Sequence, residues 1–135
     1  MKRLLIVLLA FGLLVAACGD SQEDAEAKLC DNLADLGSAL QSAEALDPAT
    51  ATVDDINDAA DAVNDAWDDV VSAAQDVESI QLDNTQTAVD DFQSTVSGIS
   101  GDSSIPEAQQ QVAAAAQTLV TQVDSINSEL SCSSS

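Results

Sequence analysis

The chain contains four stretches in which apolar residues recur at alternating spacings of three and four, the periodicity of an amphipathic α-helix. The clearest stretch covers about 53–78, and its apolar positions are Val53, Ile56, Ala60, Val63, Trp67, Val70, Ala74 and Val77. This repeat is unbroken over more than three heptads. We therefore predict a helix over about 53–78 with one continuous apolar stripe.

Three further helices are predicted on the same basis. The first covers about 22–46, the third is a shorter segment that follows Asp83, and the fourth covers about 105–130. The apolar stripe of the first consists of Leu29, Leu33, Leu36, Leu40 and Ala43, and that of the third of Val89, Phe92, Val96 and Ile99. The stripe of the fourth consists of Val112, Ala116, Leu119, Val123, Ile126 and Leu130. No stretch has the period-two alternation of a strand, so the predicted fold class is all-α.

Residues suited to cap a helix stand before each predicted helix. The pairs, each three residues apart, are Ser21 with Asp24, Thr52 with Asp55, Asp83 with Gln86, and Ser104 with Glu107. In a capping box the two side chains satisfy free backbone N–H groups at the start of a helix. Turn-like segments at Asp47-Pro48, 79–83 and 98–103 separate the helices.

The polar positions of the second predicted helix indicate how it packs. With Val53 at heptad position a, every aspartate of this helix falls at position b, c or f, on the outer face. The flanking e and g positions are uncharged and hold Asn57, Asn64, Val71, Ala59, Ala66 and Ala73. Such flanks suit close neighbours on both sides, as in a helical bundle. Trp67 lies in the middle of the stripe, and we expect a core anchor whose indole N–H finds a partner, rather than a ligand platform.

Two cysteines, Cys30 and Cys132, lie near the two ends of the helical region. A disulfide between them would close a loop of about 100 residues, which stabilises a fold by about 4 to 5 kcal/mol in the chain-entropy model. A metal site is the alternative, although the chain has no His and two thiols alone rarely hold zinc. In an up-and-down bundle the disulfide is compatible with four helices but not with three, since three would place the cysteines at opposite ends. Cys132 lies off the apolar stripe, so the fourth helix should end before it.

The N-terminal segment has the features of an export signal. Lys2 and Arg3 precede an apolar run that is too short to span a membrane. The run ends in Leu14-Val15-Ala16-Ala17-Cys18, which resembles the lipobox of bacterial lipoprotein precursors. The resemblance implies cleavage before Cys18, a diacylglyceryl thioether on its sulfur and, usually, an additional acyl chain such as palmitate on its amino group, which together suffice for stable anchoring. A soluble secreted protein in which Cys18 is incidental is the alternative.

These features predict a cleaved signal peptide over 1–17, a lipidated tether over 18–21, an up-and-down four-helix bundle over 22–132 and a disordered tail over 133–135. The expected location is the extracytoplasmic face of the cell membrane, with the lipid as anchor. In composition the chain also resembles the small Ala/Asp/Ser-rich helical lipoproteins of unknown function that are found in actinobacteria. That second resemblance implies no functional residues.

The charge balance narrows the classes of partner. All 24 acidic residues follow the signal segment, where Lys28 is the only base, so the mature net charge is about −23. Nucleic acid is excluded as a partner because binding it requires cations that replace phosphate counterions. Anionic headgroups would repel the domain as well, so the bundle should stand off the membrane.

The acidic face of the second helix is a candidate site for Ca²⁺ or Mg²⁺. Its candidate ligands are Asp54, Asp58, Asp61 and Asp65, whose 4-3-4 spacing stacks them along one face. Both ions prefer carboxylate oxygens, but tight calcium sites need several oxygens that converge, and the EF-hand pattern is absent. We expect a solvated face with weak, diffuse cation attraction and no resident cofactor.

Catalysis has few groups to use in this sequence. There is no His to act as a general base near neutral pH, and no glycine-rich phosphate loop. We therefore expect no enzymatic activity.

The fourth helix offers a neutral, amide-rich face, and its candidate contact residues are Gln110, Gln117 and Thr121. The leading hypothesis is a structural or protein-interaction module at the cell envelope, and the alternative is an envelope lipoprotein that binds divalent cations.

Overall fold

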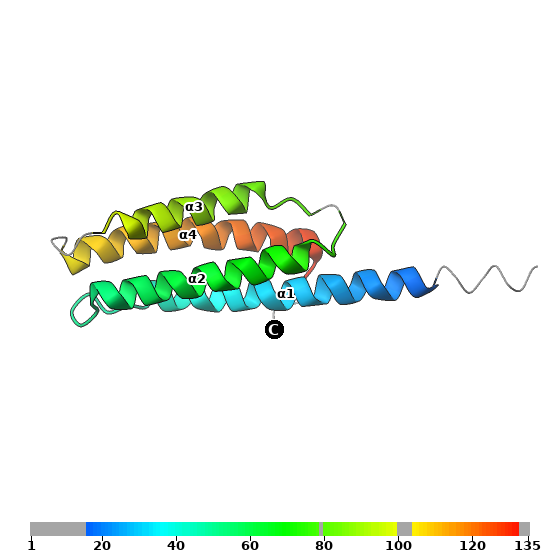
Figure 1. Cartoon of the computed structure of the whole chain (residues 1–135), viewed down its shortest axis with the longest axis horizontal. Helices are drawn as coiled ribbons and strands as arrows, with labels where there is room; N and C mark the ends of the chain where they lie inside the picture. The colour runs from blue at the N-terminus through cyan, green and yellow to red at the C-terminus, as the bar shows by residue number, and fades with distance from the viewer. Residues whose placement is uncertain (1–15, 79, 100–103, 133–135) are drawn as a thin grey trace, which may run out of the picture.

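The computed structural model describes residues 16–78, 80–99 and 104–132. Within these residues the chain forms four helices: α1 (Ala16–Glu44), α2 (Val53–Ala74), α3 (Asp83–Ser97) and α4 (Ile105–Leu130). Successive helices run in opposite directions along one another (Figure 1), so the predicted up-and-down four-helix bundle is confirmed. Residues 1–15 of the predicted signal peptide and the predicted tail, 133–135, lie outside the described residues.

Each helix packs against two neighbours. Helix α1 contacts α2 and α4, while α3 contacts α4 and, less extensively, α2. The α1–α2 and α3–α4 hairpins therefore form the two halves of the bundle. Helices α2 and α4 occupy opposite corners, so their outer faces point away from each other.

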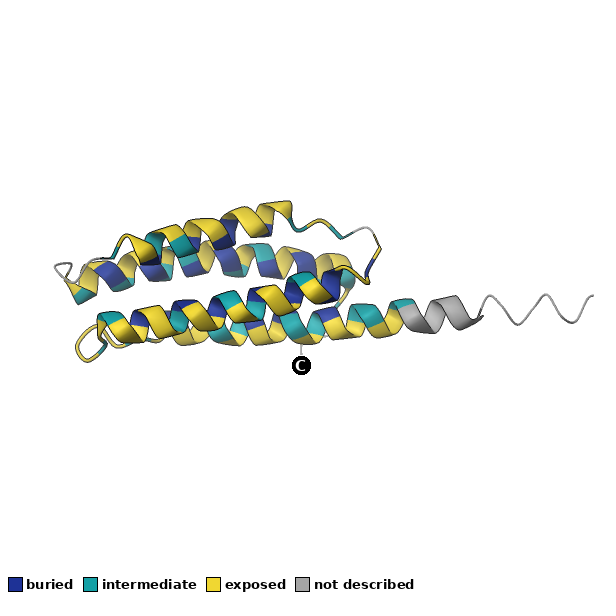
Figure 2. Cartoon of the chain, in the orientation of Figure 1, coloured by how far each residue is buried: buried dark blue, intermediate teal, exposed yellow. Residues whose placement is uncertain are grey.

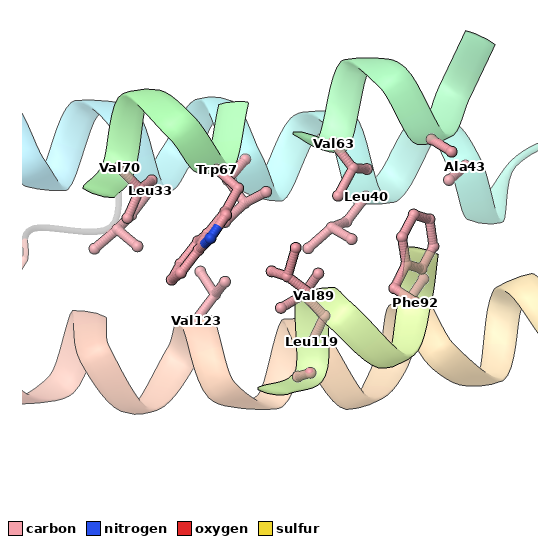
Figure 3. Packing of buried hydrophobic residues seen from close by; sticks show 14 of the residues in the cluster. Leu33, Leu40, Ala43, Val63, Trp67, Val70, Val89, Phe92, Leu119 and Val123 are labelled. Carbon is pink, nitrogen blue, oxygen red and sulfur yellow. The ribbon is translucent and has the colours of Figure 1, made fainter. Parts of the chain in front are cut away.

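The apolar stripes predicted from the sequence form the core (Figure 2). In α1 the stripe Leu29, Leu33, Leu36, Leu40 and Ala43 is fully buried. Trp67 of α2 is 3% exposed and Phe92 of α3 is 0% exposed, and both enter the space between the helices (Figure 3). At the ends of the stripes Val53, Ile99 and Leu130 are only half-buried.

Two helix boundaries differ from those predicted. Helix α1 begins at Ala16 instead of about residue 22, and the added segment Ala16-Ala17-Cys18-Gly19-Asp20-Ser21 contains only two strong helix formers, the alanines. Ser21 therefore lies inside α1 and not at an N-cap. Helix α2 ends at Ala74 instead of residue 78, and its last turn tightens as the N–H of Val77 donates to the Ala74 carbonyl three residues back at 3.1 Å. Val77 is nevertheless buried, as its spacing predicted.

The predicted capping box of α2 is confirmed. The Asp55 N–H donates to Thr52 Oγ1 at 3.2 Å, and the Thr52 N–H donates to Asp55 Oδ2 at 2.7 Å. Thr52 Oγ1–H also donates to Asp55 Oδ2, at 2.9 Å. These bonds from Thr52 stabilise the ionised carboxylate and hold the pKa of Asp55 below its ordinary value.

The caps of the next two helices only partly match the sequence. Ser104 caps α4 as predicted, since its Oγ accepts from the Glu107 N–H. The predicted Asp83–Gln86 box is wrong, because Leu82 is the N-cap of α3 and makes no side-chain capping bond. The Gln86 side chain instead accepts a hydrogen bond from Trp67 on α2.

The end of α4 turns the chain toward α1. Ser131 adopts the left-handed conformation (φ 54°), while the N–H of Cys132 donates to the Asn127 carbonyl at 2.9 Å and the N–H of Ser131 donates to the Ser128 carbonyl. This pair of bonds is a Schellman motif, which usually has glycine at the left-handed position. The helix thus ends at Leu130, before Cys132 as predicted, and the motif directs Cys132 across to α1.

Candidate functional site

The predicted disulfide is present. Cys30 of α1 and Cys132 after α4 are bonded, with their Cα atoms 5.6 Å apart, a normal separation for a disulfide. The bond joins the start of the bundle to its end, as four antiparallel helices require. Reading the two cysteines as a metal site is thereby ruled out, because both sulfur atoms are used in the bond.

Trp67 has the core role that its position predicted. Its indole Nε1–H donates to Oε1 of Gln86 on α3 at 3.0 Å, and Nε2 of Gln86 donates in turn to Asp90 Oδ1 at 3.0 Å. One turn earlier on α2, Asn64 Oδ1 accepts from Nε2 of Gln93 at 2.6 Å. Side-chain hydrogen bonds therefore bridge α2 and α3, the pair of neighbouring helices with the least extensive contact.

The candidate cation ligands Asp54, Asp58, Asp61 and Asp65 all lie exposed on the outer face of α2. Across the described ranges, no three His, Cys, Asp or Glu side chains gather in a group that could hold a metal ion. A straight helix spreads these carboxylates along its length instead of converging them. Within the described part of the chain, the α2 carboxylates therefore form no coordinating group for the cation alternative.

The predicted interaction residues Gln110, Gln117 and Thr121 are exposed on α4. Gln110 and Gln117 are seven residues apart, so they share one face of the helix, and the Thr121 hydroxyl donates to the Gln117 carbonyl at 3.0 Å. Helix α4 carries only Glu107, Asp124 and Glu129 as charged residues. Because α2 and α4 lie at opposite corners, the densely acidic face and the neutral face lie on opposite sides of the bundle.

A hollow of about 310 Å³, which was not predicted from the sequence, lies between α1 and α4. Leu33, Val120 and Val123 supply apolar lining, while Glu44 and Asp124 supply the carboxylates. Gly37 of α1 lies within it, and a Cβ atom added to Gly37 would meet no atom within 4 Å. We call this hollow the Gly37 groove; the sequence signal that could have revealed it is a glycine inside an otherwise regular helix.

A second hollow, of about 420 Å³, lies at the disulfide end of the bundle. Glu26 from α1, Glu78 from the α2–α3 connection and Glu129 from α4 line it, around apolar residues that include Val77 and Leu130. This end of the bundle is the one nearest Cys18 in the chain. It presents carboxylates, which anionic headgroups would repel.

Cys18, the predicted lipidation residue, lies in the first turn of α1, and its side chain is outside the described part of the structure. Leu14 and Val15 of the predicted lipobox lie outside the described residues as well. None of the helices described here is both long enough and apolar enough to cross a membrane.

Comparisons of this chain with protein-family models, with curated proteins and with solved structures found no match.

Proposed function

We propose that this protein is a lipoprotein of the cell envelope, held at the extracytoplasmic face of the cell membrane by acyl chains on Cys18, and that its acidic bundle acts as a structural or protein-interaction module. The lipobox residues that end in Cys18 support the anchor. The opposite placement of the acidic face of α2 and the neutral face of α4 supports protein interaction, and this is the observation that carries the proposal.

The course of α1 supports a bundle that stands off the membrane. Leu29 is eleven residues beyond Cys18 and belongs to the fully buried stripe. At 1.5 Å per residue, a continuous helix places Leu29 about 16 Å from Cys18 along its axis. This distance exceeds the Debye length of about 8 Å at physiological ionic strength, so repulsion between the bundle and anionic headgroups would be largely screened.

Charge favours α4 as the side that partners approach. The exposed aspartates of α2 create a strong negative field that repels most acidic surfaces and binds cations without specificity. The exposed positions Gln110, Gln117 and Thr121 carry no charge and offer amide and hydroxyl groups for hydrogen bonds. A neutral or acidic surface of a partner can therefore approach α4 without the repulsion that such a surface would meet at α2.

The proposal is tested by site-specific photo-crosslinking in cells of the native host. A photoreactive phenylalanine analogue replaces Gln117 on α4 in one variant and Asp61 on α2 in the matched control, since both residues are exposed. We expect a crosslinked product of defined mass from position 117 and none from position 61.

A second arm of the same experiment tests the need for the anchor. Cys18→Ser removes the sulfur that would carry the lipid, so membrane association and the crosslink from position 117 should both be lost. The proposed function is contradicted by equal products from positions 117 and 61, by no product from either, or by a crosslink that survives when Cys18→Ser releases the protein from the membrane.

A further inference from the structure

Gly37 keeps the Gly37 groove open, although the fold does not need a glycine there. Its backbone is helical without positive φ, and an added Cβ would meet no atom within 4 Å. Glycine is also less favourable than alanine inside a helix. A larger residue would thus be accommodated and would favour the helix, but it would fill part of the space between Leu33 and Val123.

The groove is held in shape at both of its ends. The Cys30–Cys132 disulfide ties α1 to the end of α4 on one side. On the other side, the Gln109 side chain near the start of α4 donates to the Leu46 carbonyl just after α1. The spacing of α1 and α4 is therefore fixed before any partner arrives, which lowers the ordering cost of binding.

We propose that the Gly37 groove docks a basic amphipathic helix of a partner protein; this proposal rests on the interaction function proposed above. A groove between two antiparallel helices accepts a third helix along its length, as in helix-in-groove recognition. Gly37 lets the backbone of that helix approach closely. The accessible residues Ala34 and Val120 supply its apolar contacts, above a floor formed by the buried Leu33 and Val123.

The carboxylates of the groove specify basic residues on the partner. Asp124 lines the hollow together with Gly37, and Glu44 is seven residues farther along α1, about 10 Å at 1.5 Å per residue. Counted from the Cys30–Cys132 disulfide, Gly37 is seven residues along α1 and Asp124 is eight residues back along the antiparallel α4, so the two residues lie at about the same level. Asp124 and Glu44 are therefore offset by about two helical turns along the groove, the axial offset of lysine or arginine at positions i and i+7 of a docked helix. Electrostatic complementarity of this kind raises association rates and fixes register.

Charge also argues against a second copy of this chain as the occupant. The mature chain has Lys28 as its only base against 24 acids, so a second copy would bring like charge into the groove. A partner helix with an apolar face and basic residues at positions i and i+7 instead matches the apolar lining of the groove and the negative charge of its two carboxylates.

The test measures binding of a designed peptide to the oxidised, detergent-solubilised full-length mature protein by fluorescence anisotropy, at physiological ionic strength. The probe is a fluorescein-labelled helical peptide of Ala, Gln and Leu with two lysines seven residues apart and two leucines between them. The control peptide has the same composition with its lysines adjacent. Protein variants are Gly37→Leu and Gly37→Ala in the groove and Ala62→Leu at an exposed position of α2.

We expect Gly37→Leu to weaken binding of the probe at least ten-fold, Gly37→Ala to weaken it less, and Ala62→Leu to leave it unchanged. Glu44→Gln and Asp124→Asn should each weaken binding several-fold more than Asp61→Asn does. Circular dichroism and the unfolding midpoint verify that each variant is folded, and Gly37→Ala keeps the test valid if the leucine disturbs packing.

Three results of the peptide experiment would overturn the groove proposal: equal binding of both peptides, equal effects of Gly37→Leu and Ala62→Leu, or equal effects of the groove carboxylates and Asp61. Each would mean that the peptide binds the polyanion without using the groove. A dimer in sedimentation that Gly37→Leu abolishes would identify a second copy as the occupant and overturn the basic helix. If a specific crosslink from Gln117 persists in any of these cases, the proposed interaction function survives while the groove proposal fails.

Discussion

The indole nitrogen of Trp67 on α2 donates a hydrogen bond of 3.0 Å to the side-chain oxygen of Gln86 on α3. Trp67 is 3% exposed, whereas Gln86 lies at the surface. The amide of Gln86 therefore satisfies the one polar atom of an otherwise apolar core residue. It does so where α2 and α3 have the least extensive contact of the neighbouring pairs, so this bond helps to fix the position of α3.

Gln86→Ala should lower the free energy of unfolding by about 1 kcal/mol, because the buried indole N–H loses its partner. Trp67 is the only tryptophan in the chain, so its fluorescence reports this site directly. Urea unfolding followed by fluorescence measures the loss, with Gln111→Ala at an exposed position of α4 as the control. Equal stability of the two variants would show that the bond contributes nothing.

Cys30→Ala with Cys132→Ala should lower the free energy of unfolding by about 4 to 5 kcal/mol, since the disulfide spans 102 residues of sequence. Thermal unfolding with and without reductant measures the effect in a Cys18→Ser background, which prevents exchange with the third thiol. Reductant should lower the midpoint of the protein that keeps both cysteines and leave the double variant unchanged. A midpoint insensitive to reductant in both proteins would contradict the expected role of the disulfide.

Ser131→Gly should raise the free energy of unfolding by about 1 kcal/mol, because residues other than glycine pay a cost in the left-handed conformation that Ser131 adopts. The matched control is Ser128→Gly, three residues earlier and inside α4, where glycine should cost about 0.5 kcal/mol. Chemical denaturation compares the two variants. A loss of stability in both would mean that the Schellman turn does not determine the effect at residue 131.

The cap of α2 gives a prediction that depends on pH. Thr52→Ala should cost about 1 kcal/mol at pH 7, while Thr52→Ser should retain most of the cap. The pKa of Asp55 is lowered by its bonds from Thr52, so its contribution to stability is present above the ordinary value of 3.8 and is lost as the pH falls through the lower folded value. The stability difference between the native protein and Asp55→Asn should therefore shrink below that value. Urea unfolding across this acidic range measures the difference, and a constant difference would contradict the assignment.

The sequence predicted the buried half of the structure accurately, because apolar spacing records which side of a helix faces the core. Val63 and Trp67 fall on the α2 stripe and are buried, while Asp61 and Asp65 fall off it and are exposed. The pairing of Cys30 with Cys132 was predicted from their positions near the two ends of the helical region, and it in turn favoured four helices over three, since only an even number of antiparallel helices brings the two residues together.

Features that depend on a partner from another helix could not be predicted in this way. Gln86 has the spacing of a cap, yet it bonds to Trp67, which is 19 residues away in sequence. Gly37 is an unfavourable residue inside a predicted helix, but the groove that it lines forms only because α4 lies beside it. The groove depends on a neighbour that periodicity alone does not identify.

The most direct test of the account is mass spectrometry of the N-terminal peptide of the protein purified from membranes of its own host. We predict that the mature chain begins at Cys18 and that this residue carries a diacylglyceryl thioether. An unmodified Cys18, or a chain that begins at any other residue, would contradict the lipid anchor and with it the proposed placement of the bundle at the membrane.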